Sequence, residues 1–312
     1  MAQTESLKKT LHSCFSDEWI SRTARSTGFV RRKGKICPIA FFWTLILGFG
    51  TGTCRTVAEL RRNFQLSTGE EVVRSSFYDG FTPALCKMLK LAVAHVCANL
   101  SEPSRKLKGK LREFQDLIVL DATVITLHEL LCGDYQASRT NHSKAAAKLL
   151  MVISVLSAGP KAIKVFSERS SEVHKLGIGA WVRGKLLLMD LGYYCFSLFE
   201  RIDRNGGYFI SRAKNNFNPV ILANNRNWRG RSRPVIGKNL QDVLPFLKRQ
   251  EIDFMVEVTV TRRSYRGKRS KVKKLFRLVG LLNQETGRYH LYVTNIGTSL
   301  SPEEIARTYA AR

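Results

Sequence analysis

Two stretches decide the fold of this 312-residue chain: LIVLD at residues 117–121 and LLLMD at residues 186–190. Each is a run of four apolar residues that ends in an aspartate. Continuous apolar runs of this length are typical of strands buried on both faces of a sheet, and such sheets occur in α/β layered folds. We therefore expect both acids, Asp121 and Asp190, to lie at strand positions in one sheet.

The repeated aspartate is also a chemical signal. Burying a lone carboxylate is costly unless a cation or hydrogen bonds compensate its charge. If the two strands are neighbours, the acids repel each other unless a divalent cation lies between them. Hard oxygen ligands favour Mg²⁺ or Mn²⁺, which also bind phosphate substrates. The alternative is that each aspartate only caps the turn after its strand.

Outward from these runs, apolar stretches and helical periodicities alternate. The pattern predicts five strands, over residues 117–127, 149–156, 162–166, 185–189 and 208–212. It predicts helices over residues 170–182 and 196–204, and a turn at Gly159-Pro160. The resulting order is β-β-β-α-β-α-β.

The flanking regions have a different character. Residues 1–110 look helical, because Ser67 and Thr68 precede two glutamates as a capping signal and residues 81–100 repeat apolar side chains at helical spacing. The basic segment 101–114 suits a linker, with a boundary near Lys110. Beyond the α/β region the pattern predicts paired strands and one helix near residues 239–249. The expected domains are residues 1–110, 111–214, a β-rich insertion at 215–300 and the start of a final helix at 301–312.

Charge indicates the partner. The chain has 51 Lys and Arg against 25 Asp and Glu, a formal net charge of +26. Such an excess favours a polyanionic partner, with nucleic acid the first candidate. The stretch TRRSYRGKRSKVKK, residues 261–274, forms the expected tip of a basic hairpin that can track phosphates.

The residues that we expect to contact DNA lie in the hairpin and in two further basic segments. They are Arg139, His142, Lys144, Trp228, Arg229, Arg231, Arg262, Arg263, Arg266, Lys268, Arg269 and Lys271. Trp228 is a candidate for stacking on a base. The alternatives are solvated basic loops and a tryptophan packed in the core.

Other function classes find little support. The longest apolar run, residues 36–49, contains a proline and is too short to cross a bilayer. No signal peptide is evident, and seven scattered cysteines without a CxxC pair suggest reduced thiols in the cytoplasm. The six histidines show no metal-binding spacing.

The motifs together resemble a known family. LIVLDATVITL, KLLLMDLGYY, GGYFISRAKNN and SSFYDGF are similar to blocks of DDE transposases, in particular of the insertion-sequence-four, Tn-five-like branch. The resemblance implies an α/β fold with an RNase H-like catalytic core, interrupted by a β-rich insert and preceded by a helical DNA-binding domain. It implies that Asp121 and Asp190 are the first two catalytic acids and metal ligands, with two Mg²⁺ or Mn²⁺ ions. It further implies double-stranded DNA as partner, a homodimer on the transposon ends, and association with the nucleoid.

The third acid of that branch belongs to a motif of Tyr, two residues, Arg, three residues, Glu, six residues and Lys. The segment EEIARTYAAR supplies Tyr309 and Arg312, which we also expect to contact DNA, but no third catalytic Glu, which falls past residue 312. Glu303 and Glu304 precede the tyrosine and do not fit. We expect a truncated or frame-interrupted transposase. The alternatives are a non-catalytic DNA-binding regulator of transposition and an RNase H-like nuclease.

Overall fold

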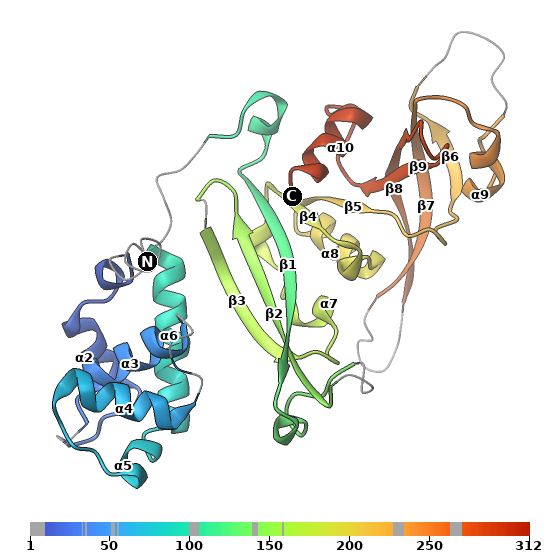
Figure 1. Ribbon diagram of the computed structural model, residues 1–312. Helices are drawn as coiled ribbons and strands as arrows, with labels where there is room; N and C mark the ends of the chain where they lie inside the picture. Colours follow the sequence, from blue (N-terminus) through green and yellow to red (C-terminus); the bar gives the residue numbers. More distant parts are fainter. Residues whose placement is uncertain are drawn as a thin grey trace. The chain divides into compact units, whose positions relative to one another are not determined.

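The chain divides into two compact units, Met1–Ser101 and Glu102–Arg312, and each is described by itself (Figure 1). The computed structural model describes residues 10–32, 34, 36–50, 54, 56–99, 106–138, 143–157, 159–226, 234–262 and 270–312. Within these residues, no helix is both long and apolar enough to span a membrane.

The N-terminal unit is helical in its described residues. Its helices are α2 (Asp17–Ser26), α3 (Pro38–Gly50), α4 (Val57–Thr68), α5 (Arg74–Tyr78) and α6 (Pro83–Asn99). Phenylalanines dominate their packing: Phe41 of α3 lies between Phe64 of α4 and Phe77 of α5, with ring centroids 6.4 and 5.2 Å away. All three rings are fully buried, so this unit has a core of its own.

One capping prediction in this unit is wrong. Ser67 and Thr68 do not begin a helix but end α4, and Gly69 follows in the left-handed conformation with φ 70°. Glycine adopts that conformation without steric cost, which makes it a common helix terminator. The capping box lies at the other end of α4, where Thr56 and Glu59 bond each other's backbone amides.

The second unit is built on a nine-stranded sheet with the order β3-β2-β1-β4-β5-β9-β8-β7-β6. β1 (Asp116–Leu127) pairs antiparallel with β2 (Ala145–Ser154), which pairs antiparallel with β3 (Gly159–Ser167). On its other side β1 pairs parallel with β4 (Lys185–Met189), which pairs parallel with β5 (Tyr208–Arg212). The predicted β-β-β-α-β-α-β order is therefore present.

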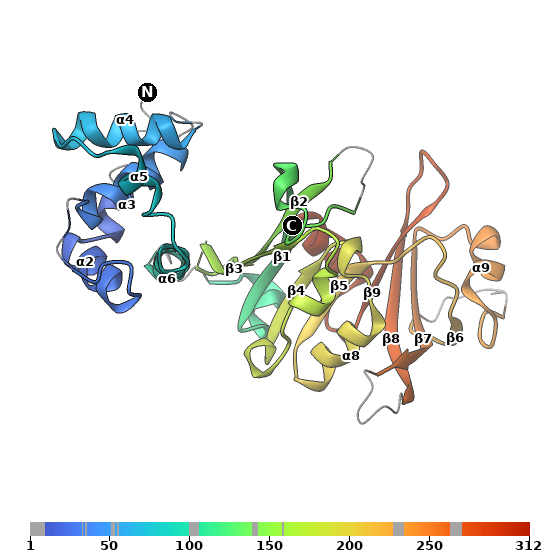
Figure 2. The same ribbon diagram turned by 90° about the horizontal axis from the view of Figure 1, so that it is seen from below.

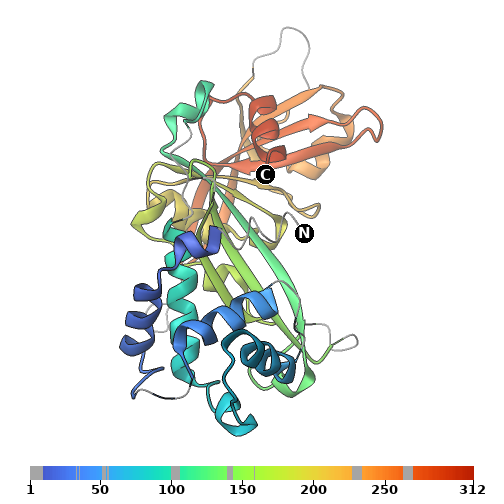
Figure 3. The ribbon, with the colours of Figure 1, turned by 60° about the vertical axis from the view of Figure 1, so that its left-hand side comes forward.

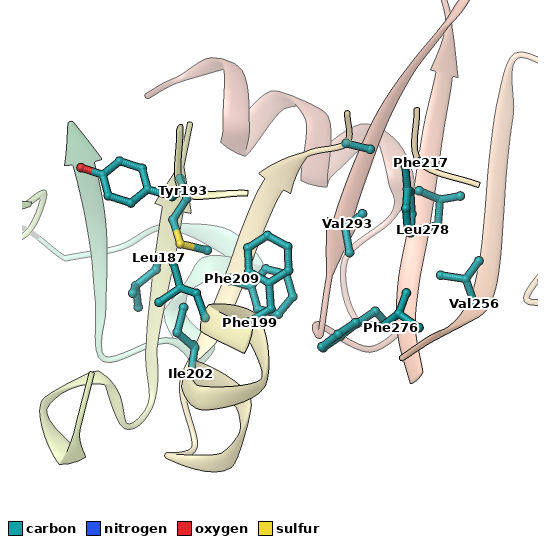
Figure 4. Close-up of a cluster of buried hydrophobic side chains, with 14 of the residues drawn as sticks. Leu187, Tyr193, Phe199, Ile202, Phe209, Phe217, Val256, Phe276, Leu278 and Val293 are labelled. Carbon is teal, nitrogen blue, oxygen red and sulfur yellow. The ribbon is translucent and has the colours of Figure 1, made fainter. Parts of the chain in front are cut away.

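Helices cover both faces of this sheet. α7 (Glu172–Lys175) and α8 (Phe196–Arg204) belong to the core formed by Leu120, Leu187 and Phe209. Figure 2 shows α8 beside the sheet, where it contacts β5. Phe199 of α8 stacks on Phe209 of β5 at 4.4 Å between ring centroids (Figure 4). The alternate residues of the same strands, among them Leu186 and Leu188, pack with Ile305 of α10 (Pro302–Ala310) on the other face.

The strands of the expected insertion continue the same sheet. They are β6 (Val220–Asn224), β7 (Glu251–Thr261), β8 (Lys271–Leu282) and β9 (Tyr289–Thr294), with the short helix α9 (Leu240–Val243) between β6 and β7. β9 pairs antiparallel with both β5 and β8, and α10 then lies against β7 and β8 (Figure 3). The sequence did not predict this continuity.

Two local predictions differ from the structure. The helix expected over residues 170–182 is reduced to α7 and a 3₁₀ turn, Ala180–Val182, because Gly177 and Gly179 interrupt it. Gly159 and Pro160 begin β3 instead of forming the turn before it. Proline is tolerated there because β3 is an edge strand.

The unit boundary also lies earlier than the position near Lys110. Lys110 is part of the second unit, since its Nζ lies 2.9 Å from Oε2 of Glu304 in α10. This ion pair links the segment before β1 to the helix after β9.

Candidate active site

The parallel pairing of β1 and β4 brings the two predicted acids together. Leu120 of β1 pairs with Met189 of β4. Asp121 follows Leu120, and Asp190 follows Met189. Neighbouring strands lie ~4.8 Å apart, so the two aspartates occupy adjacent positions.

Both acids share one face of the sheet. Side chains alternate along a strand, so Asp121 lies on the face of Leu117 and Val119, which pack in the core beneath α10. Asp190 is reached by the C-terminal residue of the chain: Nη2 of Arg312 lies 3.6 Å from its Oδ1. The site therefore lies where β1, β4 and the end of α10 meet.

The capping alternative does not describe either aspartate. Asp121 lies inside β1 and not at its end. Asp190 precedes a 3₁₀ turn, Leu191–Tyr193, yet its side chain makes no capping hydrogen bond. Both carboxylates are exposed, with 52 % of the Asp190 side chain accessible. The two carboxylates are therefore not buried, contrary to the expectation from the sequence. Their exposure leaves the oxygens of both groups accessible to a ligand.

A second group of residues lies behind the turn that follows Asp190. Nζ of Lys148 on β2 lies 2.9 Å from Oε1 of Glu172 on α7, and only 16 % and 15 % of their side chains are exposed. The Glu172 carboxylate lies close to the turn, since a Cβ added at Gly192 would lie 3.2 Å from its Oε2. This ion pair thus ties β2 and α7 to the segment that carries Asp190.

Tyr193 ends that turn and is 1 % exposed. Its hydroxyl lies near the Glu172 carboxylate, and it points away from Phe199 and Phe209 (Figure 4). Burial raises the pKa of Tyr193, and the negative charges of Glu172, Asp121 and Asp190 raise it further. The phenol therefore stays neutral at physiological pH.

Sequence reasoning did not connect Lys148, Glu172 or Tyr193 with the two aspartates. The one available signal is that the tyrosine follows Asp190 by three residues, which keeps it on the same turn. The ion pair joins two segments 24 positions apart, and neither segment has a distinctive motif.

The end of α10 provides the aromatic and cationic side of the site. The ring of Tyr309 lies 5.2 Å from that of Tyr292, and the Arg312 guanidinium carbon lies 5.4 Å from the Tyr309 ring centroid. Burial is the main cause that raises the pKa of Tyr309, and the Arg312 charge partly offsets it. Glu303 and Glu304 are engaged at the start of the helix, with Arg307 and Lys110.

The structure describes only some of the residues that were predicted to contact DNA. Arg139, His142, Trp228, Arg229, Arg231, Arg263, Arg266, Lys268 and Arg269 lie outside the described residues. Lys271 is exposed on β8, and Lys144 forms an exposed ion pair, 3.0 Å, with Glu129. Arg262 is turned inward instead: it donates two hydrogen bonds, 2.6 and 3.1 Å, to Glu200 of α8, whose carboxylate is buried. Because Arg262 pairs with Glu200 inside the protein, it stabilises the end of β7 instead of pointing towards a DNA phosphate.

The carboxylate pair fits a hard divalent cation as two of its ligands. Mg²⁺ is usually held by one or two carboxylates, with water and phosphate oxygens completing its shell. Among the described residues, no group of three His, Cys, Asp or Glu side chains is arranged to enclose a metal ion. The protein contribution seen here is thus an open, two-carboxylate site.

Comparison with known proteins gives the class. The family model of the transposase DDE domain matches residues 112–312, and the chain belongs to this family. It is similar to the transposase for insertion sequence element IS1151 of Clostridium perfringens, with 22 % identity over 214 residues. The match covers 67 % of this chain and 45 % of that relative, so the chain spans less than half of the relative's length. The predicted transposase and insertion-sequence assignments are confirmed at this level.

Proposed function

We propose that this chain belongs to the insertion-sequence-four branch and carries two of the acids for metal-dependent DNA cleavage and strand transfer at insertion-sequence ends. The observation that carries the proposal is the adjacency of Asp121 and Asp190 on one sheet face, inside a transposase DDE domain. The strand order β3-β2-β1-β4-β5, with only β2 antiparallel to its neighbours, supports an RNase H-like core.

In this proposal the two aspartates hold divalent cations against the scissile phosphate. Bound Mg²⁺ or Mn²⁺ would activate the attacking oxygen and stabilise the leaving oxygen. Lys148 and Glu172 hold the turn after Asp190 in place, which fixes the position of its carboxylate. Arg312 supplies a positive charge beside Asp190 that can also meet a DNA phosphate.

The third acid is proposed to follow Arg312 in a longer chain. In the motif of this branch the glutamate comes seven residues after Tyr309, and residues spaced by three, four and seven share one helix face. Tyr309 and Arg312 occupy the face that reaches Asp190, which supports a continuation of α10 towards the site. On this proposal, residues 1–312 are catalytically incomplete, and the complete enzyme works as a homodimer on DNA.

The test uses Asp121→Asn and Asp190→Asn, in this chain and in one extended through the glutamate. We expect Mn²⁺ binding to weaken in both lengths, and nicking of transposon-end DNA by the extended chain to fall at least about 100-fold, because charge stabilisation at the phosphate is lost. Asp134→Asn, at an exposed acid away from the strand pair, is the matched control. Unchanged Mn²⁺ affinity in both site variants would overturn the assigned roles.

A non-catalytic regulator of transposition is the second candidate. It is favoured by the absence of a third carboxylate beside the pair among the described residues. Tight binding of end DNA without nicking, in the extended chain as well, would identify it. A nuclease of the RNase H type would instead prefer an RNA–DNA hybrid to a terminal-repeat duplex.

A further inference from the structure

The N-terminal unit contains a cavity of about 710 Å³ that none of the preceding assignments uses. It lies among the end of α2, the start of α3 and the segment that joins them. Of the described residues, three arginines line it, Arg25, Arg31 and Arg32, together with Cys37 and one carboxylate, Glu70.

The three guanidinium groups lack a charged or hydrogen-bonding partner among the residues that the structure describes. All three residues are exposed, and none of their side chains forms an ion pair or hydrogen bond with another described residue. Like charges gathered around one cavity repel each other, and one glutamate cannot neutralise three of them. A bound anion would compensate the three positive charges.

The start of α3 adds to this positive field. The helix is 13 residues long, begins at Pro38 on the cavity wall and has no acidic residue in its first turn. The first amides of a helix lack intrahelical partners and carry a partial positive charge. The start of α3 and the three arginines thus line the same cavity.

The lining also indicates what kind of anion fits. Among the described residues that line the cavity none is aromatic, so they offer no surface on which a base could stack. Its volume is in the range of sites for whole organic ligands and exceeds that of one phosphate ion. The guanidinium group of arginine can donate two parallel hydrogen bonds to two oxygens of one phosphate.

We propose that this arginine cavity grips consecutive phosphates of a DNA backbone without reading its sequence. The proposal rests on the proposed function only in that DNA is the polyanion. It assigns the DNA grip of the N-terminal unit to a defined site, separate from the aspartate pair.

Cys37 allows a direct test with the intact chain. It lines the cavity and is exposed, whereas Cys86 is an exposed cysteine of the same unit that does not line it. We expect a duplex of unrelated sequence, at about ten times its Kd, to slow iodoacetamide alkylation of Cys37 about tenfold and leave Cys86 unchanged. Equal rates with and without DNA would overturn the proposal, as would equal protection by millimolar inorganic phosphate alone.

Charge removal gives the second measurement. The variants Arg25→Gln, Arg31→Gln and Arg32→Gln should each flatten the plot of log affinity against log salt by about 0.9, the value for one phosphate contact. Arg62→Gln on α4, an exposed arginine outside the cavity, makes the same charge change and should leave the slope unaltered. Equal slopes for cavity and control variants would contradict the proposal.

The two proposals fail separately. Asp121→Asn should abolish nicking by the extended chain while Cys37 stays protected by DNA. If the arginine variants keep the full salt slope and nicking still depends on Asp121, the cavity proposal is wrong and the catalytic one stands. If Cys37 is protected but nicking does not depend on Asp121, the catalytic proposal is wrong and the cavity proposal stands.

Discussion

At the scale of residues, the ion pair between Lys148 and Glu172 is the structural support of the candidate site. It connects β2 and α7 to the turn after Asp190, and both side chains are mostly buried. A buried charge whose partner is removed keeps its desolvation cost and loses its compensation. The site therefore depends on a pair that touches neither aspartate directly.

Lys148→Met should lower the free energy of unfolding by about 3 kcal/mol, because it leaves Glu172 buried without a partner. The double variant Lys148→Met/Glu172→Gln should recover part of this loss, since no unpaired charge remains. Urea unfolding at pH 7 measures both. Lys161→Met, at an exposed lysine of β3, is the control, and an equal loss there would contradict the role of the pair.

The same residues show what sequence can predict about a site. Asp121 and Asp190 could be predicted because the four apolar residues before each one mark a buried strand, which places the next residue in or beside the sheet. Lys148 and Glu172 could not, because their importance arises only when β2 and α7 meet. The inward turn of Arg262 was missed for the same reason: its partner, Glu200, lies on a distant helix.

At the scale of elements, the start of α10 follows from local sequence signals. Ser301 and Glu304 form a capping box, and Pro302 occupies the first helical position. The backbone amide of Ser301 and the ammonium of Lys110 both bond the Glu304 carboxylate and lower its pKa below the ordinary 4.5. The helix start is thus tied to an ionised side chain.

This predicts a pH dependence with a definite sign. A carboxylate with a lowered pKa in the folded state stabilises the fold above its ordinary pKa, and the contribution is lost as pH falls through the lowered value. At pH 7, Glu304→Gln should cost about 0.5 kcal/mol, a small value because the group is exposed and screened. The difference between wild type and variant, from urea unfolding at a series of pH values, should shrink as pH falls below 4.5.

Glu303→Gln serves as the comparison, because Glu303 pairs only with the exposed Arg307. Its difference from wild type should stay close to zero at every pH. A Glu304→Gln difference that grows on acidification would contradict the assignment.

The elements also differ in how far sequence predicts them. β4 and α8 match their expected bounds because a continuous apolar run and a helical periodicity are both local signals. The continuity of β9 with β5 escaped prediction, because the paired residues Ile210 and Thr294 lie far apart in the chain. Pairing of distant strands leaves no trace in either segment alone.

At the scale of the whole molecule, the two units have separate hydrophobic cores. Phe64 and Phe77 belong to the N-terminal core, whereas Leu187 and Phe209 belong to the sheet. The division between Ser101 and Glu102 follows this separation. Each unit should therefore respond to core damage independently.

Phe64→Ala should destabilise the N-terminal unit by about 3–4 kcal/mol, because it removes a fully buried ring. Hydrogen exchange read by mass spectrometry should show faster exchange in α3, α4 and α5, with β1 and β4 unchanged. Leu66→Ala, at a side chain that is 86 % exposed on the same helix, should change neither unit. Equal acceleration in both units would show that they unfold together.

The length of the sheet also bears on how the protein behaves in concentrated solution. A sheet that ends in a strand with free backbone groups can recruit a strand from another copy and so begin a fibre. β3 forms one such margin, and it carries Pro160 and the exposed lysines Lys161 and Lys164. A missing amide donor and repelling ammonium groups oppose the docking of an identical strand there, so this rim protects the chain against self-templated aggregation.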